Sequence, residues 1–134
     1  MSDKVFIDTL FLVALINKQD RYHQKALELA DRTENCTYFC TNIILFEVGN
    51  ALSKNYREQA IQLIHCLLGS DRVEMVNLTP ELFDRAVNFY RQHQDKEWGL
   101  VDCLSFVVMR QYQIDRALTF DKHFTQAGFQ AWMR

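Results

Sequence analysis

Four carboxylates in this sequence occupy positions that a purely structural role explains poorly when they are taken together. Asp8 ends the apolar segment VFID and Asp121 ends ALTFD, whereas Glu47 and Asp102 interrupt the apolar stretches IILFEVGNAL and LVDCLSFVVM. The first two segments are typical of short buried strands and the other two of helices. In an open α/β sheet, strand ends and the N-termini of the following helices share one edge, so we expect the four acids to converge there.

Such a convergence requires a positive charge to offset it. Carboxylates a few ångströms apart repel one another, and their pKa values rise until one or more is neutral. A divalent cation removes this repulsion, and oxygen ligands suit Mg²⁺, with Mn²⁺ as a second choice. A cation in an acidic pocket lowers the pKa of a bound water, orients it towards phosphorus and stabilises the leaving oxygen. The pattern therefore indicates phosphodiester hydrolysis by metal-bound acids.

Each acid taken singly also has a structural interpretation. Asp8, Asp102 and Asp121 all fall near an expected helix start, where aspartate is favoured by capping and by the helix dipole. Glu47 is also compatible with a place at the edge of its apolar face, from which it would reach solvent. The joint pattern favours the metal site, and the sequence leaves these alternatives open.

The segments that carry the acids resemble a known family. FIDTLFLVALIN, ILFEVGNALSK, WGLVDCLSFVVMRQY and ALTFDKHFTQAGF are similar to the four acidic motifs of PIN-domain ribonucleases, and the short chain is most similar to the VapC-like toxins of type II toxin–antitoxin pairs. The resemblance covers nearly the whole chain, with only residues 56–94 generic. It implies catalytic, metal-binding acids at Asp8, Glu47, Asp102 and Asp121. It also implies a Mg²⁺-dependent endoribonuclease that acts on RNA, forms a homodimer and is silenced by a cognate antitoxin.

One departure from the family pattern concerns a hydroxyl group. Many relatives carry Ser or Thr just before the third acid, where this chain has Leu100-Val101. Thr9 and Ser105 are weaker candidates to supply that hydroxyl. Asp95 is a weaker candidate for a further carboxylate, because a solvated loop aspartate explains it more simply. The sequence assigns no RNA-contacting residues, although basic and aromatic side chains are expected near the same edge: Lys18, Lys54, Arg57, Lys96, Trp98, Lys122 and His123.

The elements that must position these residues alternate along the chain. Strands are expected at 5–7, 36–40, 73–78 and 116–120, with a further one at 129–133. Helices are expected at 9–17, 22–33, from 41 or 42 to about 54, at 58–68, from a Thr79-Pro80 start to about 93, and at 101–112. This alternation predicts an α/β three-layer sandwich with a central, mainly parallel five-stranded sheet. Strands 5–7 and 117–120 are expected in its interior.

Composition predicts one cytoplasmic domain spanning residues 1–134. The chain has one Pro and four Gly, which leaves no linker or low-complexity tract, and its longest uncharged run is far shorter than the roughly 20 residues that span a bilayer. We expect no signal peptide and four reduced cysteines. Lys and Arg number 15 against 17 Asp and Glu, for a net charge of −2. An RNA partner must therefore be held by a local patch or by bound cations.

Two other functions compete with the nuclease interpretation. A non-catalytic PIN-like module that binds RNA or protein would usually have lost at least one acid, and here all four are present. An aspartate phospho-acceptor domain needs a paired acid cluster or an Asp-x-Asp arrangement after the first strand, which Asp8-Thr9-Leu10 does not provide. Leu and Phe side chains at helical spacing on more than one helix face indicate apolar surface beyond a single core. We expect a two-fold partner or an antitoxin helix to cover it.

Overall fold

Five short parallel strands form the middle layer of the protein. The computed structural model describes residues 3–134; the expected domain 1–134 also includes Met1 and Ser2, which lie outside the described residues. The strand order is β3-β2-β1-β4-β5, and every pair is parallel. This confirms the predicted parallel five-stranded sheet, with β1 and β4 in its interior. The strands are β1 (Lys4–Ile7), β2 (Thr37–Thr41), β3 (Val73–Val76), β4 (Arg116–Leu118) and β5 (Gln130–Ala131).

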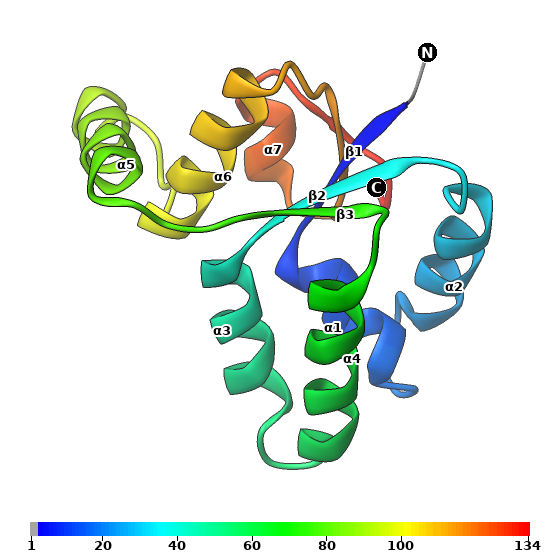
Figure 1. Cartoon of the computed structure of the whole chain (residues 1–134). Helices are drawn as coiled ribbons and strands as arrows, with labels where there is room; N and C mark the ends of the chain where they lie inside the picture. Colours follow the sequence, from blue (N-terminus) through cyan, green and yellow to red (C-terminus); the bar gives the residue numbers. More distant parts are fainter. Residues whose placement is uncertain (1–2) are drawn as a thin grey trace.

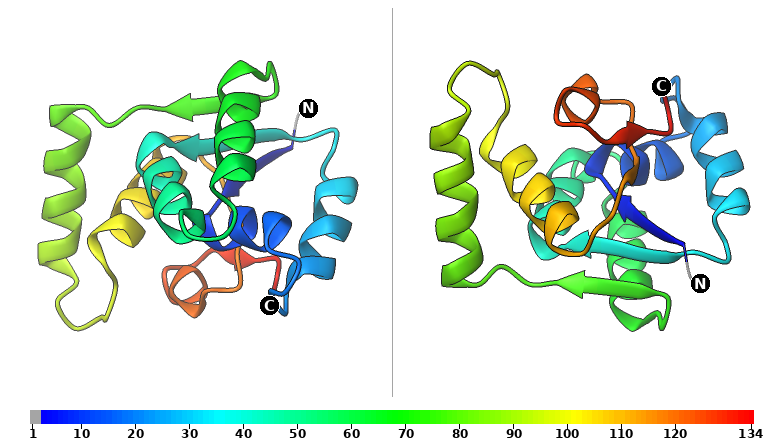
Figure 2. Two further views of the ribbon diagram at one scale, coloured as in Figure 1. Left: turned by 90° about the horizontal axis from the view of Figure 1, so that it is seen from below. Right: turned by 90° about the horizontal axis from the view of Figure 1, so that it is seen from above.

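Helices cover both faces of this sheet, as predicted. Helices α1, α3 and α4 lie on one face, and α6 and α7 lie on the other (Figures 1 and 2). Helix α2 packs beside α1, and α5 packs against α6. The helices are α1 (Thr9–Ile16), α2 (His23–Arg32), α3 (Asn42–Leu52), α4 (Arg57–Gly69), α5 (Pro80–Gln92), α6 (Leu100–Gln111) and α7 (Lys122–Gln126).

The central strand β1 is apolar throughout its buried part because helices cover both of its faces. Val5, Phe6 and Ile7 are all 2% exposed or less. On one side, the Phe6 ring lies 6.4 Å from the ring of Phe124 in α7, and Phe124 meets Phe106 of α6 edge to face at 5.0 Å. This continuous aromatic packing fixes α6 and α7 against the sheet, and with them the two acids that these helices position.

Strand β4 ends two residues earlier than the sequence suggested. It stops at Leu118, and just beyond it Thr119 Oγ1 accepts a hydrogen bond of 3.1 Å from the backbone N–H of Asp121. The expected strand 36–40 likewise begins one residue later, since the N–H of Cys36 bonds to the Thr33 carbonyl in a turn. The strand expected at 129–133 is reduced to two residues. Hydropathy patterns do not predict such hydrogen bonds, and therefore they do not fix the exact ends of the strands.

Within residues 3–134, no helix combines the length and the apolar character needed to cross a membrane. The four cysteines are free thiols, as expected, and two of them are buried. Burial raises the pKa of the Cys40 thiol to about 12 and that of Cys103 to about 11, so both stay protonated near neutral pH.

Candidate metal centre

Asp8 lies at the carboxyl end of the central strand and is nearly buried. The residue is 7% exposed, and its backbone N–H donates a hydrogen bond to the Leu118 carbonyl of β4. Asp8 is the N-cap residue of α1, yet its carboxylate accepts no capping hydrogen bond. Instead Oδ2 accepts a hydrogen bond of 2.8 Å from Thr119 Oγ1. Asp8 therefore stands at the cap position without the usual side-chain cap hydrogen bond, and its burial needs another explanation.

Burial sets the electrostatics of this carboxyl group. Desolvation raises the pKa of Asp8 from 3.8 to about 7, and the negative charges of Asp102 and Asp121 add to this rise. The hydrogen bonds from Thr119 and from the Thr9 backbone oppose it. Near neutral pH, Asp8 is therefore close to half-protonated in the absence of a cation. A bound cation would restore its full negative charge.

Glu47 reaches the same edge from α3. This helix begins at Asn42, directly after β2, because the Thr41 hydroxyl accepts the N–H of Ile44 at 3.2 Å and caps the first turn. Glu47 lies in the second turn, and its Oε1 accepts a hydrogen bond of 2.6 Å from Thr9 Oγ1 at the start of α1. The side chain is therefore directed towards the start of α1, next to Asp8 in the sequence.

Asp102 and Asp121 both serve as helix caps. The Gly99 backbone N–H donates to Asp102 Oδ2 at 3.1 Å and ties the start of α6. Asp121 is the N-cap of α7, and its Oδ1 accepts the backbone N–H of His123 at 2.9 Å. For these two acids the structural interpretation is correct, and it is compatible with a metal site because capping leaves further lone pairs on each carboxylate.

All four predicted acids line one cavity of about 530 Å³ at the carboxyl edge of the sheet. Within residues 3–134, no Lys or Arg forms an ion pair with any of them. The described part of the protein thus concentrates negative charge in a hollow without supplying a Lys or Arg partner, which is costly unless a cation enters. The cavity is lined by Asp8, Thr9, Leu10, Glu47, Asn50, Ala51, Asp102 and Asp121.

The three weaker candidates have different positions. Thr9 lines the cavity and holds Glu47. Ser105 is 1% exposed on the core side of α6 and does not line the cavity. Asp95 also lies outside it: its side chain is 69% exposed and pairs with Lys96 at 3.3 Å. The structure therefore brings together the four acids and Thr9, and leaves Ser105 and Asp95 apart from them.

Two residues of the site were not singled out for these contacts by sequence reasoning. Thr119 supplies the hydroxyl that contacts Asp8, and it lies two residues before Asp121 in the TFD segment. His123 was expected near the same edge, among basic and aromatic residues that could contact RNA, but not beside an acid; its Nδ1 lies 2.9 Å from Asp102 Oδ2 and 3.5 Å from Asp121 Oδ1. A polar residue in an otherwise apolar strand was the signal for Thr119. His123 had none, because its contact with Asp102 joins two helices.

A family model described as "PIN domain" matches residues 5–130. The chain belongs to the PIN-domain family. This PIN domain is 30% identical over 125 residues to "23S rRNA-specific endonuclease VapC20" of Mycobacterium tuberculosis, an alignment that covers 93% of this chain and 95% of that protein. The crystal structure of VapC20, described as a sarcin-ricin loop cleaving toxin, superposes with a TM-score of 0.83 at 29% identity over 93% of this chain and 95% of that one.

More distant structures share the fold of this PIN domain. VapBC2 of Rickettsia felis, bound to a DNA fragment from its promoter, gives a TM-score of 0.65 at 19% identity, with 96% of both chains covered. A toxin–antitoxin complex from Klebsiella pneumoniae gives 0.59 at 18% identity, with 88% of this chain and 87% of that chain covered. Together with VapC20, these structures confirm the predicted three-layer architecture.

Proposed function

We propose that this protein is a divalent-metal-dependent endoribonuclease, the toxin of a toxin–antitoxin pair, that hydrolyses RNA phosphodiester bonds in the cytoplasm. The observation that carries the proposal is the cavity lined by Asp8, Glu47, Asp102 and Asp121 without a Lys or Arg partner among residues 3–134. Membership of the PIN family and the similarity to an endonuclease over nearly the whole chain support the same conclusion.

The donor set of the cavity fits Mg²⁺, with Mn²⁺ as the alternative. The four acids offer hard carboxylate oxygens, which both ions accept. When bound, the cation supplies an activated water and positive charge at the phosphate. Asp8 is the residue most affected, because its raised pKa reflects a charge that the folded protein holds poorly without such an ion.

The protein's own residues fix the directions of these carboxylates before any ligand arrives. The hydroxyl of Thr119 holds Asp8, the hydroxyl of Thr9 holds Glu47, and backbone N–H groups hold the other two acids. Each hydrogen bond uses one lone pair and leaves others facing the cavity. Such outer hydrogen bonds orient metal ligands and raise the affinity of a site by reducing the ordering that binding requires.

The similarity to VapC20 suggests which class of RNA to test first as a substrate. VapC20 is named for its action on 23S rRNA, and we propose structured ribosomal RNA as the substrate class for this chain. With a net charge of −2, the protein attracts RNA poorly through its overall field. The cation in the cavity therefore contributes to binding of the scissile phosphate as well as to its hydrolysis.

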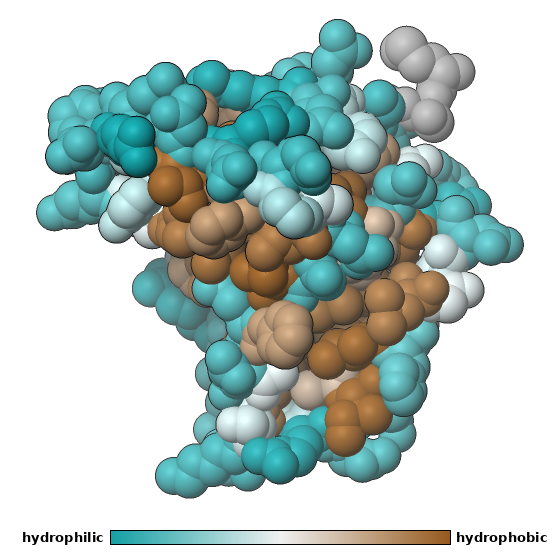
Figure 3. Space-filling view, turned by 60° about the vertical axis from the view of Figure 1, so that its left-hand side comes forward, coloured by the Kyte–Doolittle hydropathy of each residue, from teal (hydrophilic) through white to brown (hydrophobic). Residues whose placement is uncertain are grey.

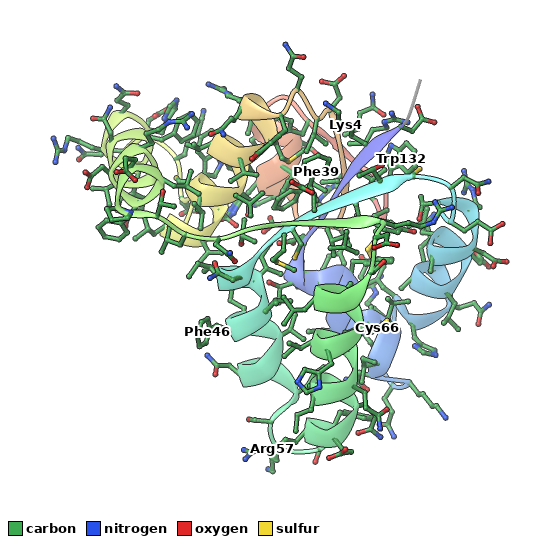
Figure 4. The ribbon with its side chains drawn as sticks, in the orientation of Figure 1. Lys4, Phe39, Phe46, Arg57, Cys66 and Trp132 are labelled. Atoms are coloured by element: carbon green, nitrogen blue, oxygen red, sulfur yellow. The ribbon has the colours of Figure 1, made fainter. Side chains whose placement is uncertain are left out.

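An apolar face of the molecule supports protein partners. Figure 3 shows apolar residues gathered across the middle of one face, with polar residues around them. Phe46 projects outward from α3 (Figure 4) and is 70% exposed. We propose that a second copy of the chain and a cognate antitoxin cover these exposed apolar side chains, as expected from the sequence. The large apolar side chains that remain exposed are Leu27, Phe46, Ile61, Leu68, Phe83, Tyr90 and Leu100.

The test is cleavage of end-labelled RNA by the purified protein. Single-stranded RNA and intact ribosomes are incubated with the protein in millimolar Mg²⁺, with EDTA in parallel. We expect discrete internal cuts that EDTA abolishes. RNA binding without cuts in any divalent ion would favour the non-catalytic binding module, and cuts that EDTA leaves unchanged would contradict the metal-dependent mechanism.

A further inference from the structure

His123 places a nitrogen donor beside two of the carboxylates that line the cavity. Its Nδ1 is 2.9 Å from Asp102 Oδ2 and 3.5 Å from Asp121 Oδ1, and one ligand atom of each residue lies within 4.8 Å of the other two. Adjacent ligands of an octahedral ion bound at about 2.1 Å are about 3 Å apart, and opposite ligands are about 4 Å apart. The distances from His123 Nδ1 to the two carboxylates therefore fall within the range expected for ligands of one cation.

This cluster is held in place by groups outside it. Asp102 is fixed by the Gly99 N–H at the start of α6, and α7 is fixed against the core by Phe124, which is fully buried. The side chains of His123, Asp102 and Asp121 are 20%, 21% and 26% exposed. They are thus open enough for an ion to enter and shielded enough for their charges to act strongly.

The charge around the cluster is a second observation that points to a cation. Asp102 and Asp121 line the same cavity as Asp8 and Glu47, so four carboxylates gather in one hollow. In the part of the chain that the structure describes, His123 is the one basic side chain that pairs with either acid. A single imidazole beside several carboxylates does not neutralise them, whereas a divalent ion held by the same groups would.

We propose that His123 is a metal ligand together with Asp102 and Asp121, and that its imidazole biases this part of the site towards transition-metal ions over Mg²⁺. The inference rests on the proposed metal-dependent function and goes beyond it by assigning a fifth ligand and a selectivity. Imidazole is a good ligand for borderline ions, whereas Mg²⁺ prefers oxygen donors and keeps much of its water. The site then has an all-oxygen part at Asp8 and Glu47 and a mixed part where His123 meets Asp102 and Asp121 beside the cavity.

The experiment compares metal binding by the metal-free wild type and by His123→Asn. The Asn amide keeps a donor able to hydrogen-bond to Asp102, but it does not replace an imidazole as a metal ligand. Co²⁺ binding is followed by visible absorption and Mg²⁺ binding by calorimetry. We expect the Co²⁺ dissociation constant to rise roughly ten-fold or more in His123→Asn. We expect that of Mg²⁺ to change about two-fold at most, because Mg²⁺ uses the oxygen ligands.

A matched control and a measurement on the unaltered protein complete the design. His65→Asn changes an exposed histidine on α4 and should leave both dissociation constants unchanged. In the Co²⁺-loaded wild type, proton NMR should show a strongly shifted, exchangeable imidazole N–H resonance from a ligating histidine. This measurement decides the question even if His123→Asn folds poorly.

Two results would overturn the inference. Unchanged Co²⁺ affinity in His123→Asn would show that His123 only positions Asp102, and an equal loss of Co²⁺ and Mg²⁺ affinity would show that it confers no selectivity. None of these measurements involves RNA. A protein that binds Co²⁺ through His123 yet cuts no RNA would refute the proposed function and leave the ligand assignment intact. Mg²⁺-dependent cutting by a protein in which His123 gives no selectivity for Co²⁺ would support the proposed function and refute the further inference.

Discussion

Asp8 is the residue at which the stability and the function of this protein conflict. Its pKa is raised to about 7, mainly by burial. Between about pH 4 and pH 7 the folded protein therefore keeps a proton that the unfolded chain has lost, so the free energy of unfolding falls as the pH rises through this window. Above about pH 7 the charged carboxylate remains buried, and the loss is complete.

Asp8→Asn should remove this pH dependence. Without divalent ions, we expect the variant to be more stable than the wild type at pH 8 by an amount on the order of a few kcal/mol, and about equal to it near pH 4. Urea denaturation in EDTA at several pH values measures the difference. Millimolar Mg²⁺ should reduce this difference in stability, because it should bind and stabilise the wild type alone. A variant that is less stable than the wild type at pH 8 would contradict the assigned burial cost.

Thr119 should tune the ionisation of Asp8. Its hydroxyl donates to Asp8 Oδ2 at 2.8 Å and lowers the pKa of that carboxyl group against the effect of burial. In Thr119→Val the pKa of Asp8 should rise further, so the pH at which RNA cleavage reaches half its maximum should move upward. The lost hydrogen bond should also cost about 1–2 kcal/mol of stability.

Thr119→Ser provides the control, because it keeps the hydroxyl at the same position. Its pH profile for cleavage should follow that of the wild type. If the Val and Ser variants have the same pH profile, the hydroxyl does not act on Asp8 in the way described.

Residue identity alone indicated the acids better than their partners. Asp8 and Glu47 were identifiable because a charge in an apolar segment stands out in any sequence. Thr119 and His123 were not assigned their contacts, because each acts on an acid that belongs to another element. Such pairs depend on how β4 lies beside β1 and how α7 lies beside α6, and hydropathy patterns along one chain carry no information on that arrangement.

At the scale of elements, the ends of strands and the first turns of helices position the acids of the cavity. The alternation of apolar runs predicted the order of strands and helices and their parallel sheet. It did not predict where β4 ends: the strand stops at Leu118, and the Thr119 hydroxyl then accepts a hydrogen bond from the Asp121 N–H. It also left open which acids are caps. The structure separates them: the carboxylates of Asp102 and Asp121 accept hydrogen bonds at helix starts, whereas that of Asp8, the N-cap residue of α1, makes no cap hydrogen bond.

The cap of α3 should affect stability and activity together. Thr41→Ala removes the acceptor for the Ile44 N–H, which should cost about 1 kcal/mol. Because α3 carries Glu47, RNA cleavage should fall several-fold as well. Thr79→Ala removes the equivalent cap of α5, where Thr79 accepts the Leu82 N–H at 3.1 Å.

The α5 variant is the matched control. Neither Thr79 nor any other residue of α5 lines the acidic cavity, so it should lose similar stability in thermal denaturation and keep wild-type cleavage. Equal cleavage by the two variants would show that the start of α3 does not position Glu47.

The whole molecule combines a slightly acidic charge with an exposed apolar face. Because the net charge is negative, we expect a bound cation to contribute to the binding of RNA. The apolar face favours association with another protein chain. Light scattering at micromolar concentration should give a mass about twice 15.9 kDa. Phe46→Ser, which removes the most exposed large apolar side chain among residues 3–134, should shift the protein towards monomer. A monomeric wild type at every concentration would contradict the proposed homodimer.

The most direct test of the metal-dependent site is RNA cleavage by Asp8→Asn and Asp102→Asn in millimolar Mg²⁺. Asn keeps the shape of each side chain, and at position 102 it still accepts the Gly99 N–H, so both folds should persist by circular dichroism. We predict that each variant loses roughly 100-fold or more of the cleavage rate, because each removes a charged ligand of the cation. Wild-type cleavage by both folded variants would contradict the assignment of this cavity as the catalytic metal site.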